Sequence, residues 1–285
     1  MEQVRTIGEI MSGVASGFSE DIDPTEFICE KHGKYWGRVE RLIALGRGRV
    51  IEPPCPTCEE ERRKAEAEEE KLHKKDIEAK LEKYRTDRYR EMNIGEKFWN
   101  ESFDTFNAYT DELKRYLQIC VAFAENPQGR MLVMIGNNGN GKDHLAASAL
   151  KKIGGSMYSV FELELLLRQS YTGQTSEWDI YDRLCHAPLL VINEIGKHKP
   201  GDWEMNFISY IINKRYENMK PVILISNTHL KDNCPQNGCD KCLQHYIGND
   251  VISRIIEEGE IMIFTGDDYR AKKREMAVNN GENNA

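Results

Sequence analysis

The chain has 285 residues and a net charge of −8, and 40% of its residues are hydrophobic against 30% charged. This composition supports one full-sized domain plus an accessory region, and no segment approaches the ~20 consecutive apolar residues of a membrane span, so we expect a soluble, cytoplasmic protein. The acidic balance excludes attraction of the whole molecule to nucleic acid, so any such binding requires a local basic patch.

The cysteines are clustered, which favours metal binding over disulfides in a chain that we expect to be cytoplasmic. The first cluster pairs Cys29 with His32 and, after 22 intervening residues, Cys55 with Cys58. Two such pairs, each with two residues between its members, suit the tetrahedral geometry of Zn²⁺, and Pro56 stiffens the second pair. We therefore predict a zinc finger within an N-terminal arm, residues 1–58. The alternative is four unrelated polar residues.

The segment between the two ligand pairs is basic. Residues 31–50 hold six Lys and Arg against one Glu, and Tyr35 and Trp36 are adjacent. Such a segment can hold a phosphate backbone and stack a base. It can equally form the solvated face and the small core of the finger, and the sequence leaves both readings open.

Residues 59–90 contain no Gly or Pro and are mostly charged, with sparse apolar positions. This pattern indicates an exposed helix or semi-rigid spacer rather than a packed domain. No a/d heptad is sustained, which argues against a coiled coil. Residues 59–93 are therefore predicted to be a charged helical linker.

From residue 94 onward, short continuous apolar runs alternate with helical patterns. One helical face is formed by Leu113, Leu117, Cys120, Val121 and Ala124. Strands are predicted at 131–135, 156–160, 189–192, 221–226 and 261–264, and further helices at 144–153, 161–171, 177–186 and 203–219. This alternation predicts an α/β fold with a five-stranded parallel sheet covered by helices on both faces. The domain is expected over 94–271, followed by a basic and polar tail at 272–285.

The most specific motif, residues 131–147, reads MLVMIGNNGNGKDHLAA. An apolar strand, a glycine-rich turn and a helix follow one another in the order that a phosphate-binding P-loop requires. Glycines let several N–H groups point at one anion, the helix N-terminus adds its dipole, and Lys142 places a charge on the phosphates. A glycine turn with a chance lysine is the alternative. The predicted nucleotide-binding residues of this motif are Gly136, Asn137, Asn138, Gly139, Asn140, Gly141, Lys142, Asp143 and His144.

A P-loop needs a second element that reaches the magnesium ion and the attacking water. The run LLVINE at 189–194 supplies it, with Asn193 where an aspartate normally supports the ion. Asp143 replaces the usual Ser or Thr after the lysine, so the pair still carries one carboxylate. We predict that Glu194 activates water and that Asn227, at the next strand end, hydrogen-bonds the γ-phosphate or that water. An exposed glutamate and a turn-starting asparagine are the alternatives.

The series GNNGNGKDHLA, LLVINEIG, ILISNTHL, NDVISRI and DDYR resembles the AAA+ P-loop NTPase modules of bacterial and phage replicative-helicase loaders of the DnaC type. The related ATPase helpers of transposition, the IstB type, share most of this pattern. The resemblance covers about residues 94–271, and a CxxH…CxxC finger before the module is similar to phage-encoded members. It implies ATP and Mg²⁺ as ligands and self-association through the ATP site. It also implies two partners, a hexameric replicative DNA helicase held by the N-terminal domain and single-stranded DNA.

By position, the resemblance assigns Lys142 as the phosphate lysine, Asn193 and Glu194 as the metal and water pair, and Asn227 as the first sensor. It also implies that Arg254 is the arginine finger that reaches a neighbour's γ-phosphate, and that Arg270 is the second sensor arginine. The residues alone do not single out Arg254, which would otherwise be one more helix arginine.

An insertion, KDNCPQNGCDKCLQH, separates the first sensor from Arg254. Cys234, Cys239 and Cys242 lie in it, and His245 follows three residues after the last cysteine. These four residues suit a second zinc ion, and three reduced surface thiols are the alternative.

The sequence as a whole predicts an ATPase that loads a replicative DNA helicase onto single-stranded DNA during DNA replication. Two alternatives remain open. One is an IstB-like transposition helper that binds duplex DNA. The other is a nucleotide-binding adaptor with negligible hydrolysis.

Overall fold

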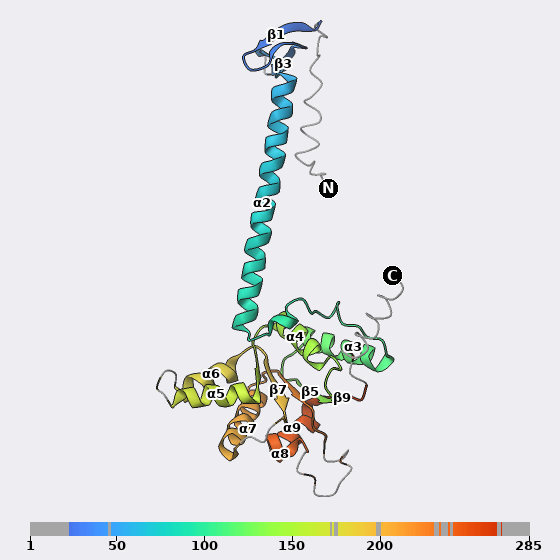
Figure 1. The fold of residues 1–285 in the computed structure, drawn as a ribbon, viewed down its shortest axis with the longest axis vertical. Helices are drawn as coiled ribbons and strands as arrows, with labels where there is room; N and C mark the ends of the chain where they lie inside the picture. Colours follow the sequence, from blue (N-terminus) through green and yellow to red (C-terminus); the bar gives the residue numbers. More distant parts are fainter. Residues whose placement is uncertain are drawn as a thin grey trace, which may run out of the picture. The chain divides into compact units, whose positions relative to one another are not determined.

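The computed structural model describes residues 23–44, 47–171, 173, 176–197, 201–230, 234, 239, 242–266 and 269 (Figure 1). The predicted second sensor Arg270 and the tail at 272–285 lie outside these residues. The chain divides into two compact units, residues 1–82 and 83–285.

Two antiparallel hairpins belong to the N-terminal unit. Strand β1 (Thr25–Cys29) pairs with β2 (Gly33–Gly37), and β3 (Glu40–Ala44) pairs with β4 (Arg47–Ile51). In the first hairpin, Phe27 stacks on Tyr35 with ring centroids 5.6 Å apart, and the Tyr35 hydroxyl donates to the Pro53 carbonyl at 2.6 Å. Because Cys29 pairs with Gly33 at the turn, the hairpin brings Cys29 and His32 to the same end.

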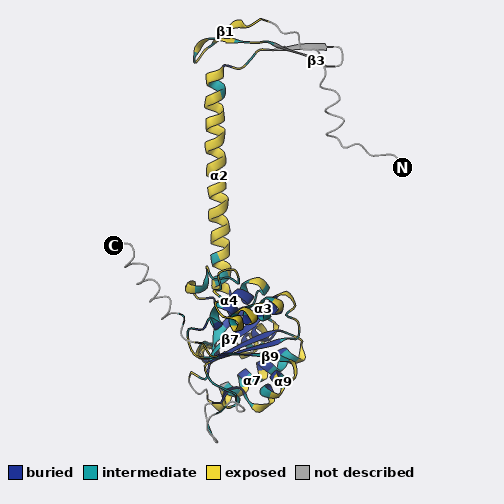
Figure 2. Cartoon of the chain, turned by 90° about the vertical axis from the view of Figure 1, so that its right-hand side faces the viewer, coloured by how far each residue is buried: buried dark blue, intermediate teal, exposed yellow. Residues whose placement is uncertain are grey.

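Helix α2 (Pro56–Glu91) has no buried residue and confirms the exposed helix predicted over 59–90 (Figure 2). It begins at a proline. Proline lacks a backbone N–H, but the N–H groups of the first helical turn have no acceptor within the helix, so no hydrogen bond is lost. Along the helix, acidic residues pair with Lys four positions later, as in Glu60–Lys64 and Asp76–Lys80, both at 2.7 Å. These pairs support a helix that buries no apolar face. No helix in the described part of the chain has the length and apolar character needed to cross a membrane.

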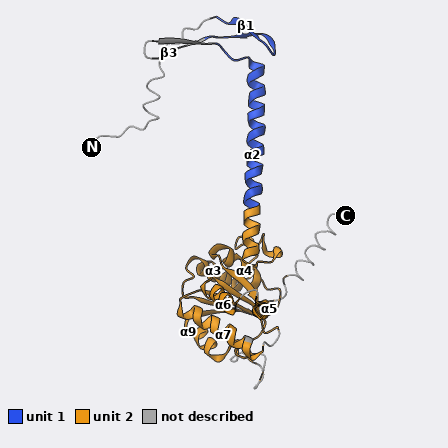
Figure 3. Ribbon diagram, turned by 90° about the vertical axis from the view of Figure 1, so that its left-hand side faces the viewer, with its two compact units in different colours: residues 1–82 blue, residues 83–285 orange. Residues whose placement is uncertain are grey.

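The second unit is an α/β domain built on one sheet (Figure 3). The strand order is β6-β7-β8-β5-β9, and every neighbouring pair is parallel, which confirms the predicted five-stranded parallel sheet. The strands are β5 (Met131–Gly136), β6 (Ser156–Ser159), β7 (Leu190–Ile195), β8 (Val222–Ser226) and β9 (Gly259–Phe264). The α-helices are α3 (Asp111–Glu125), α4 (Lys142–Ile153), α5 (Val160–Ser170), α6 (Glu177–His186), α7 (Asp202–Glu217), α8 (Gln244–Ile247) and α9 (Asn249–Glu258), and a 3₁₀ turn, η1, covers Glu96–Phe98.

Alternate strand residues point into two separate cores, one on each face of the sheet. Leu132 and Ile223 pack with α3 and α4, whereas Val133 and Leu224 pack with the helices from α5 to α9. Both faces are therefore covered, and a strand covered on both faces has to be apolar at successive positions. This is why β5, β7 and β8 read as continuous apolar runs.

Several helix boundaries differ from the sequence expectation, and α7 covers Asp202–Glu217 rather than 203–219. Helix α4 begins at Lys142 rather than at His144, because Gly141 takes a left-handed conformation and ends the P-loop turn directly before the lysine. Val160 opens α5 rather than closing β6. The Ser159 side chain accepts from the Glu162 N–H while the Glu162 carboxylate accepts from the Ser159 N–H, and this capping box fixes the helix start.

Candidate nucleotide-binding site

The glycines of the P-loop are required by its backbone. Gly136, Gly139 and Gly141 have φ angles of 139°, 84° and 88°, which residues other than glycine rarely adopt. A Cβ on Gly136 would lie 2.1 Å from the Phe264 carbonyl oxygen, and one on Gly141 would lie 2.6 Å from the Phe106 ring. The loop thus folds tightly between β5 and α4, with the N-terminus of α4 facing the space beyond the sheet edge.

Lys142 lies inside this loop. Its side chain is buried, with 5% of the residue exposed, and Nζ donates to the carbonyl oxygens of Gly136 at 2.8 Å and Asn137 at 2.5 Å. A phosphate oxygen carries negative charge and a backbone carbonyl does not, so a phosphate attracts the ammonium more strongly. The ammonium is therefore placed to transfer its bonds to phosphate oxygens within the loop.

Asp143, Asn193 and Glu194 lie together at the carboxyl ends of β5 and β7. The Asn193 amide donates to Asp143 Oδ1 at 2.7 Å, and Asn193 Oδ1 accepts from the Glu194 N–H at 2.5 Å. Burial raises the pKa of the Asp143 carboxyl, with Lys142 opposing that shift. Mg²⁺ in nucleotide sites uses one or two carboxylates together with phosphates and waters, so the single carboxylate of Asp143 fits such an ion.

Glu194 occupies a strained position. Its φ is 58°, and the pairing of β7 with β8 shifts register between Ile192 and Ile195. Non-glycine residues rarely hold a positive φ, and such strain concentrates at functional positions. The side chain is 40% exposed and its Oε1 accepts from Lys197 Nζ at 2.8 Å. The carboxylate is thus directed away from the core, and its action on water stays a prediction.

Two other predicted residues have different surroundings. Asn227 directly follows β8 and is exposed. His144 lies 2.8 Å from a Glu101 carboxylate oxygen and 2.7 Å from the Ser102 carbonyl oxygen, and it meets the Phe106 ring edge-on. His144 therefore ties the start of α4 to the segment before α3. Nucleotide contact by either residue stays a prediction.

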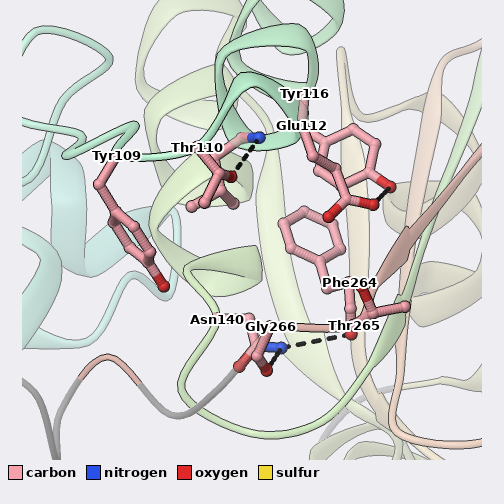
Figure 4. A pocket seen from close by; sticks show the side chains of 9 residues that line it. Tyr109, Thr110, Glu112, Tyr116, Asn140, Phe264, Thr265 and Gly266 are labelled. Atoms are coloured by element: carbon pink, nitrogen blue, oxygen red, sulfur yellow. Dashed lines mark hydrogen bonds between the residues drawn. The ribbon is translucent and has the colours of Figure 1, made fainter.

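A hollow of about 350 Å³ adjoins the P-loop at Asn140 (Figure 4). The Asn140 amide donates to the Gly266 carbonyl at 2.9 Å, while its Oδ1 is buried without a partner in the described part of the protein. Tyr109 stacks on Tyr269 with centroids 5.7 Å apart, and the Tyr269 N–H donates to the Gly139 carbonyl. The sequence analysis did not predict the lining of this hollow, because the lining residues come from distant segments of the chain. The lining residues are Tyr109, Thr110, Glu112, Leu113, Tyr116, Asn140, Phe264, Thr265 and Gly266.

Arg254 lies on α9, where it contacts α7. Its guanidinium donates to Asn213, lies 3.6 Å from the Asp250 carboxylate, and sits 5.2 Å from the centre of the Tyr216 ring. Its side chain remains 28% exposed. These neighbours hold the guanidinium at the surface, in reach of another molecule.

The four predicted zinc ligands of the N-terminal unit come together. The ligand atoms of Cys29, His32, Cys55 and Cys58 all lie within 4.8 Å of one another. Cys29 Sγ is 3.6 Å from Cys58 Sγ, and His32 Nδ1 is 3.8, 3.8 and 3.2 Å from the three sulfurs. Tetrahedral Zn²⁺, with Zn–S of about 2.3 Å and Zn–N of about 2.0 Å, needs ligand atoms about 3.5–3.8 Å apart. The donor set therefore fits zinc.

A further residue supports this cluster from α2. Glu61 Oε1 lies 3.3 Å from His32 Nε2, the ring nitrogen that faces away from the sulfurs. Carboxylates commonly orient a metal-binding histidine in this way. No spacing pattern in the sequence indicates Glu61, because it approaches His32 through the α2 helix that also holds Cys58. Of the adjacent aromatic pair, Tyr35 packs in the hairpin, whereas Trp36 is 67% exposed.

Comparisons with known proteins show similarity over the part of the chain that contains the P-loop. The family model described as IstB-like ATP binding protein matches residues 76–277. The replicative helicase loader DnaC of Escherichia coli strain K12 is 24% identical over 182 residues, which are 61% of this chain and 70% of that protein. DnaC of Buchnera aphidicola subsp. Acyrthosiphon pisum strain APS is 25% identical over 187 residues, 62% of this chain and 72% of that protein.

Solved structures show the same fold. The crystal structure of the DnaC helicase loader superposes with a TM-score of 0.51 at 27% identity, over 60% of this chain and 99% of that chain. The crystal structure of DnaI has a TM-score of 0.50 at 17% identity, over 61% of this chain and 96% of that chain, and shows likeness of fold. The matched family model spans most of the chain and includes the P-loop, so the protein belongs to the family of IstB-like ATP binding proteins.

Proposed function

We propose that the protein is an ATP-dependent loader that delivers a hexameric replicative helicase onto single-stranded DNA. The observation that carries this proposal is the joining of Lys142, Asp143, Asn193 and Glu194 at one sheet edge. Relatives named as replicative helicase loaders, similar over the same domain, support the choice of substrate.

In this proposal, ATP binds with its phosphates in the P-loop and its base in the hollow beside Asn140. Lys142 binds the β- and γ-phosphates, and Asp143 helps to hold Mg²⁺, which neutralises phosphate charge when bound. Glu194 orients and activates water, with Asn227 as a second hydrogen-bonding group. Arg254 reaches the γ-phosphate of a neighbouring subunit, and the second sensor role of Arg270 stays a proposal from resemblance.

The N-terminal unit is proposed to be the partner-binding arm. One Zn²⁺ bound by Cys29, His32, Cys55 and Cys58 would supply folding free energy that this small unit lacks, because its described part buries few side chains. The exposed Trp36 ring is suited to stacking on a nucleic-acid base. The helicase is the proposed protein partner of this arm.

Capture from host lysate tests the partner. Full-length tagged protein should recover a replicative helicase that mass spectrometry identifies, and Cys55→Ser/Cys58→Ser protein should not. Recovery of a transposase in its place would favour the transposition helper. Trp36→Ala is the matched surface control, and it should keep the helicase if the ring serves DNA alone.

ATP hydrolysis tests the enzyme class. Single-stranded DNA should stimulate turnover by the wild-type protein, and Lys142→Ala protein should show neither nucleotide binding nor turnover. If the wild type binds ATP but hydrolyses none with or without DNA and helicase, the protein is a nucleotide-binding adaptor. Preferential stimulation by duplex DNA would instead support the transposition helper.

A further inference from the structure

A second group of His and Cys side chains comes together in the segment between β8 and α8. The ligand atoms of His229, Cys234, Cys239 and Cys242 all lie within 4.8 Å of one another. His229 Nε2 is 3.3 Å from Cys234 Sγ and 3.4 Å from Cys239 Sγ. One imidazole nitrogen and three sulfurs form a donor set typical of structural zinc sites.

The distances match those expected around a zinc ion. Zn–S bonds of about 2.3 Å and a Zn–N bond of about 2.0 Å in a tetrahedron place nitrogen and sulfur about 3.5 Å apart. The two measured nitrogen–sulfur distances lie within about 0.2 Å of that value. Sulfur and nitrogen donors in a tetrahedral set select zinc over magnesium or calcium, which prefer oxygen.

The fold fixes both ends of the insertion. His229 and Cys242 form a parallel backbone bridge, and the Leu243 N–H donates to the His229 carbonyl at 2.9 Å. Cys242 is 2% exposed and Leu243 is fully buried, so this base belongs to the domain core. The first and last ligands are therefore held by the sheet domain, and Cys234 and Cys239 join them from the loop between.

The histidine is not the one that the sequence spacing indicated. His245 is exposed on α8 and lies outside the cluster, whereas His229 lies upstream, close after the end of β8. The Cys-x2-Cys spacing of Cys239 and Cys242 favours a downstream histidine as the fourth ligand. The parallel bridge instead brings an upstream residue beside Cys242, and only the chain path reveals this ligand.

We propose that His229 Nε2 and the thiolates of Cys234, Cys239 and Cys242 bind one structural Zn²⁺ that anchors the insertion to the sheet domain. Binding replaces three S–H protons, which pass to solvent, and involves no oxidation. His229 also lines a hollow of about 360 Å³ with Asn137 of the P-loop and with Thr228. The zinc would therefore hold the segment that follows β8 in place beside the P-loop.

Zinc stoichiometry of the full-length chain tests this site separately from the N-terminal finger. Elemental analysis after dialysis should give two zinc ions for the wild type and one for Cys55→Ser/Cys58→Ser. Adding Cys234→Ser/Cys239→Ser to that variant should remove the remaining ion. Within the Cys55→Ser/Cys58→Ser background, His229→Ala should weaken metal retention, while the matched control His245→Ala should leave it unchanged.

Cobalt gives a second readout in which all four ligands of the second cluster are intact. Co²⁺ added to Cys55→Ser/Cys58→Ser protein from which zinc has been removed by a chelator should produce thiolate-to-cobalt charge-transfer absorption with one-to-one stoichiometry. A folded protein, by circular dichroism, that binds neither ion would overturn the proposal in favour of reduced thiols. A disulfide among Cys234, Cys239 and Cys242 in mass analysis, or loss of the ion in His245→Ala, would overturn it as well.

Discussion

Asp143 and Asn193 share a 2.7 Å hydrogen bond at the position where a nucleotide's metal ion is expected. A carboxylate at a helix N-terminus is favoured by the helix dipole, yet burial raises its pKa and so disfavours the charged form. Phosphates in the P-loop would add strong repulsion unless a cation bridged them. We therefore infer that nucleotide binding is tightly coupled to magnesium.

The coupling can be measured with two substitutions. ATP should bind the wild type at least about tenfold more tightly with Mg²⁺ than in EDTA, a difference of about 1.4 kcal/mol. Asp143→Thr should reduce the magnesium-dependent part of binding, because no carboxylate then faces the ion. Asp143→Thr/Asn193→Asp should restore it. Titration of ATP in both buffers checks this, and equal wild-type affinities or additive effects of the two substitutions would contradict it.

Arg254 provides a second test of a single site residue. Its contacts with Asn213 and Asp250 orient the guanidinium without burying it. Arg254→Ala should bind ATP normally but lose DNA-stimulated hydrolysis by about 10³-fold, the scale of an arginine finger. Mixing it with excess Lys142→Ala protein should restore part of the activity, because each variant supplies what the other lacks.

The mixing experiment needs one control. Arg183→Ala removes an exposed arginine from α6 and should leave hydrolysis unchanged. Hybrid assembly has to be verified by tagging the two variants differently. If verified hybrids show no recovery at any ratio, Arg254 acts within its own subunit or has no part in hydrolysis.

Between elements, one buried side chain joins a helix end to the sheet. Arg215 of α7 is fully buried and donates to the carbonyl oxygens of Leu184, Cys185, Ala187 and Pro221 at 2.6–3.1 Å. The first three carbonyls lie at the C-terminal end of α6, where the helix dipole favours a positive charge. Burial lowers the pKa of Arg215 to about 10, so the guanidinium remains charged at neutral pH.

Arg215→Met should lower the free energy of unfolding of the sheet domain by about 3 kcal/mol or more. It fills part of the volume but leaves several buried carbonyls without a donor, each costing about 1–3 kcal/mol. Urea unfolding followed by tryptophan fluorescence measures the loss, with Arg183→Met as the exposed control. A change no larger than the control's would show that water or local rearrangement satisfies those carbonyls.

The elements that could be predicted from sequence are those with a strong local pattern. Continuous apolar runs located β5, β7 and β8, and the absence of Gly and Pro located α2. Other features depend on contacts between distant segments, and local patterns contain no signal for them. His229 joins the second cluster through a backbone bridge, Glu61 reaches His32 from α2, and Tyr109 reaches the P-loop side through the fold.

Over the whole molecule, the N-terminal finger and the nucleotide site belong to separate compact units. The finger ligands lie within residues 29–58 of the first unit, and the P-loop residues lie within the second. The first unit has a small described core, whereas the second has an apolar core on each face of its sheet. The zinc of the N-terminal finger should therefore govern the folding of the first unit and leave nucleotide binding by the second unaffected.

This separation predicts the behaviour of full-length Cys55→Ser/Cys58→Ser protein. Two thiolate ligands are lost, so the N-terminal site should release its zinc, and the hairpins should lose the folding free energy that the metal supplies. Proteolysis should then cut within residues 23–54, which should resist cleavage in the zinc-loaded wild type. ATP affinity should stay within about twofold of the wild type, a change under about 0.5 kcal/mol.

Glu69→Gln, an exposed substitution on α2, is the matched control. Unchanged zinc content and cleavage in the cysteine variant would rule out a zinc-dependent finger, and a large loss of ATP affinity would show that the two units are energetically coupled.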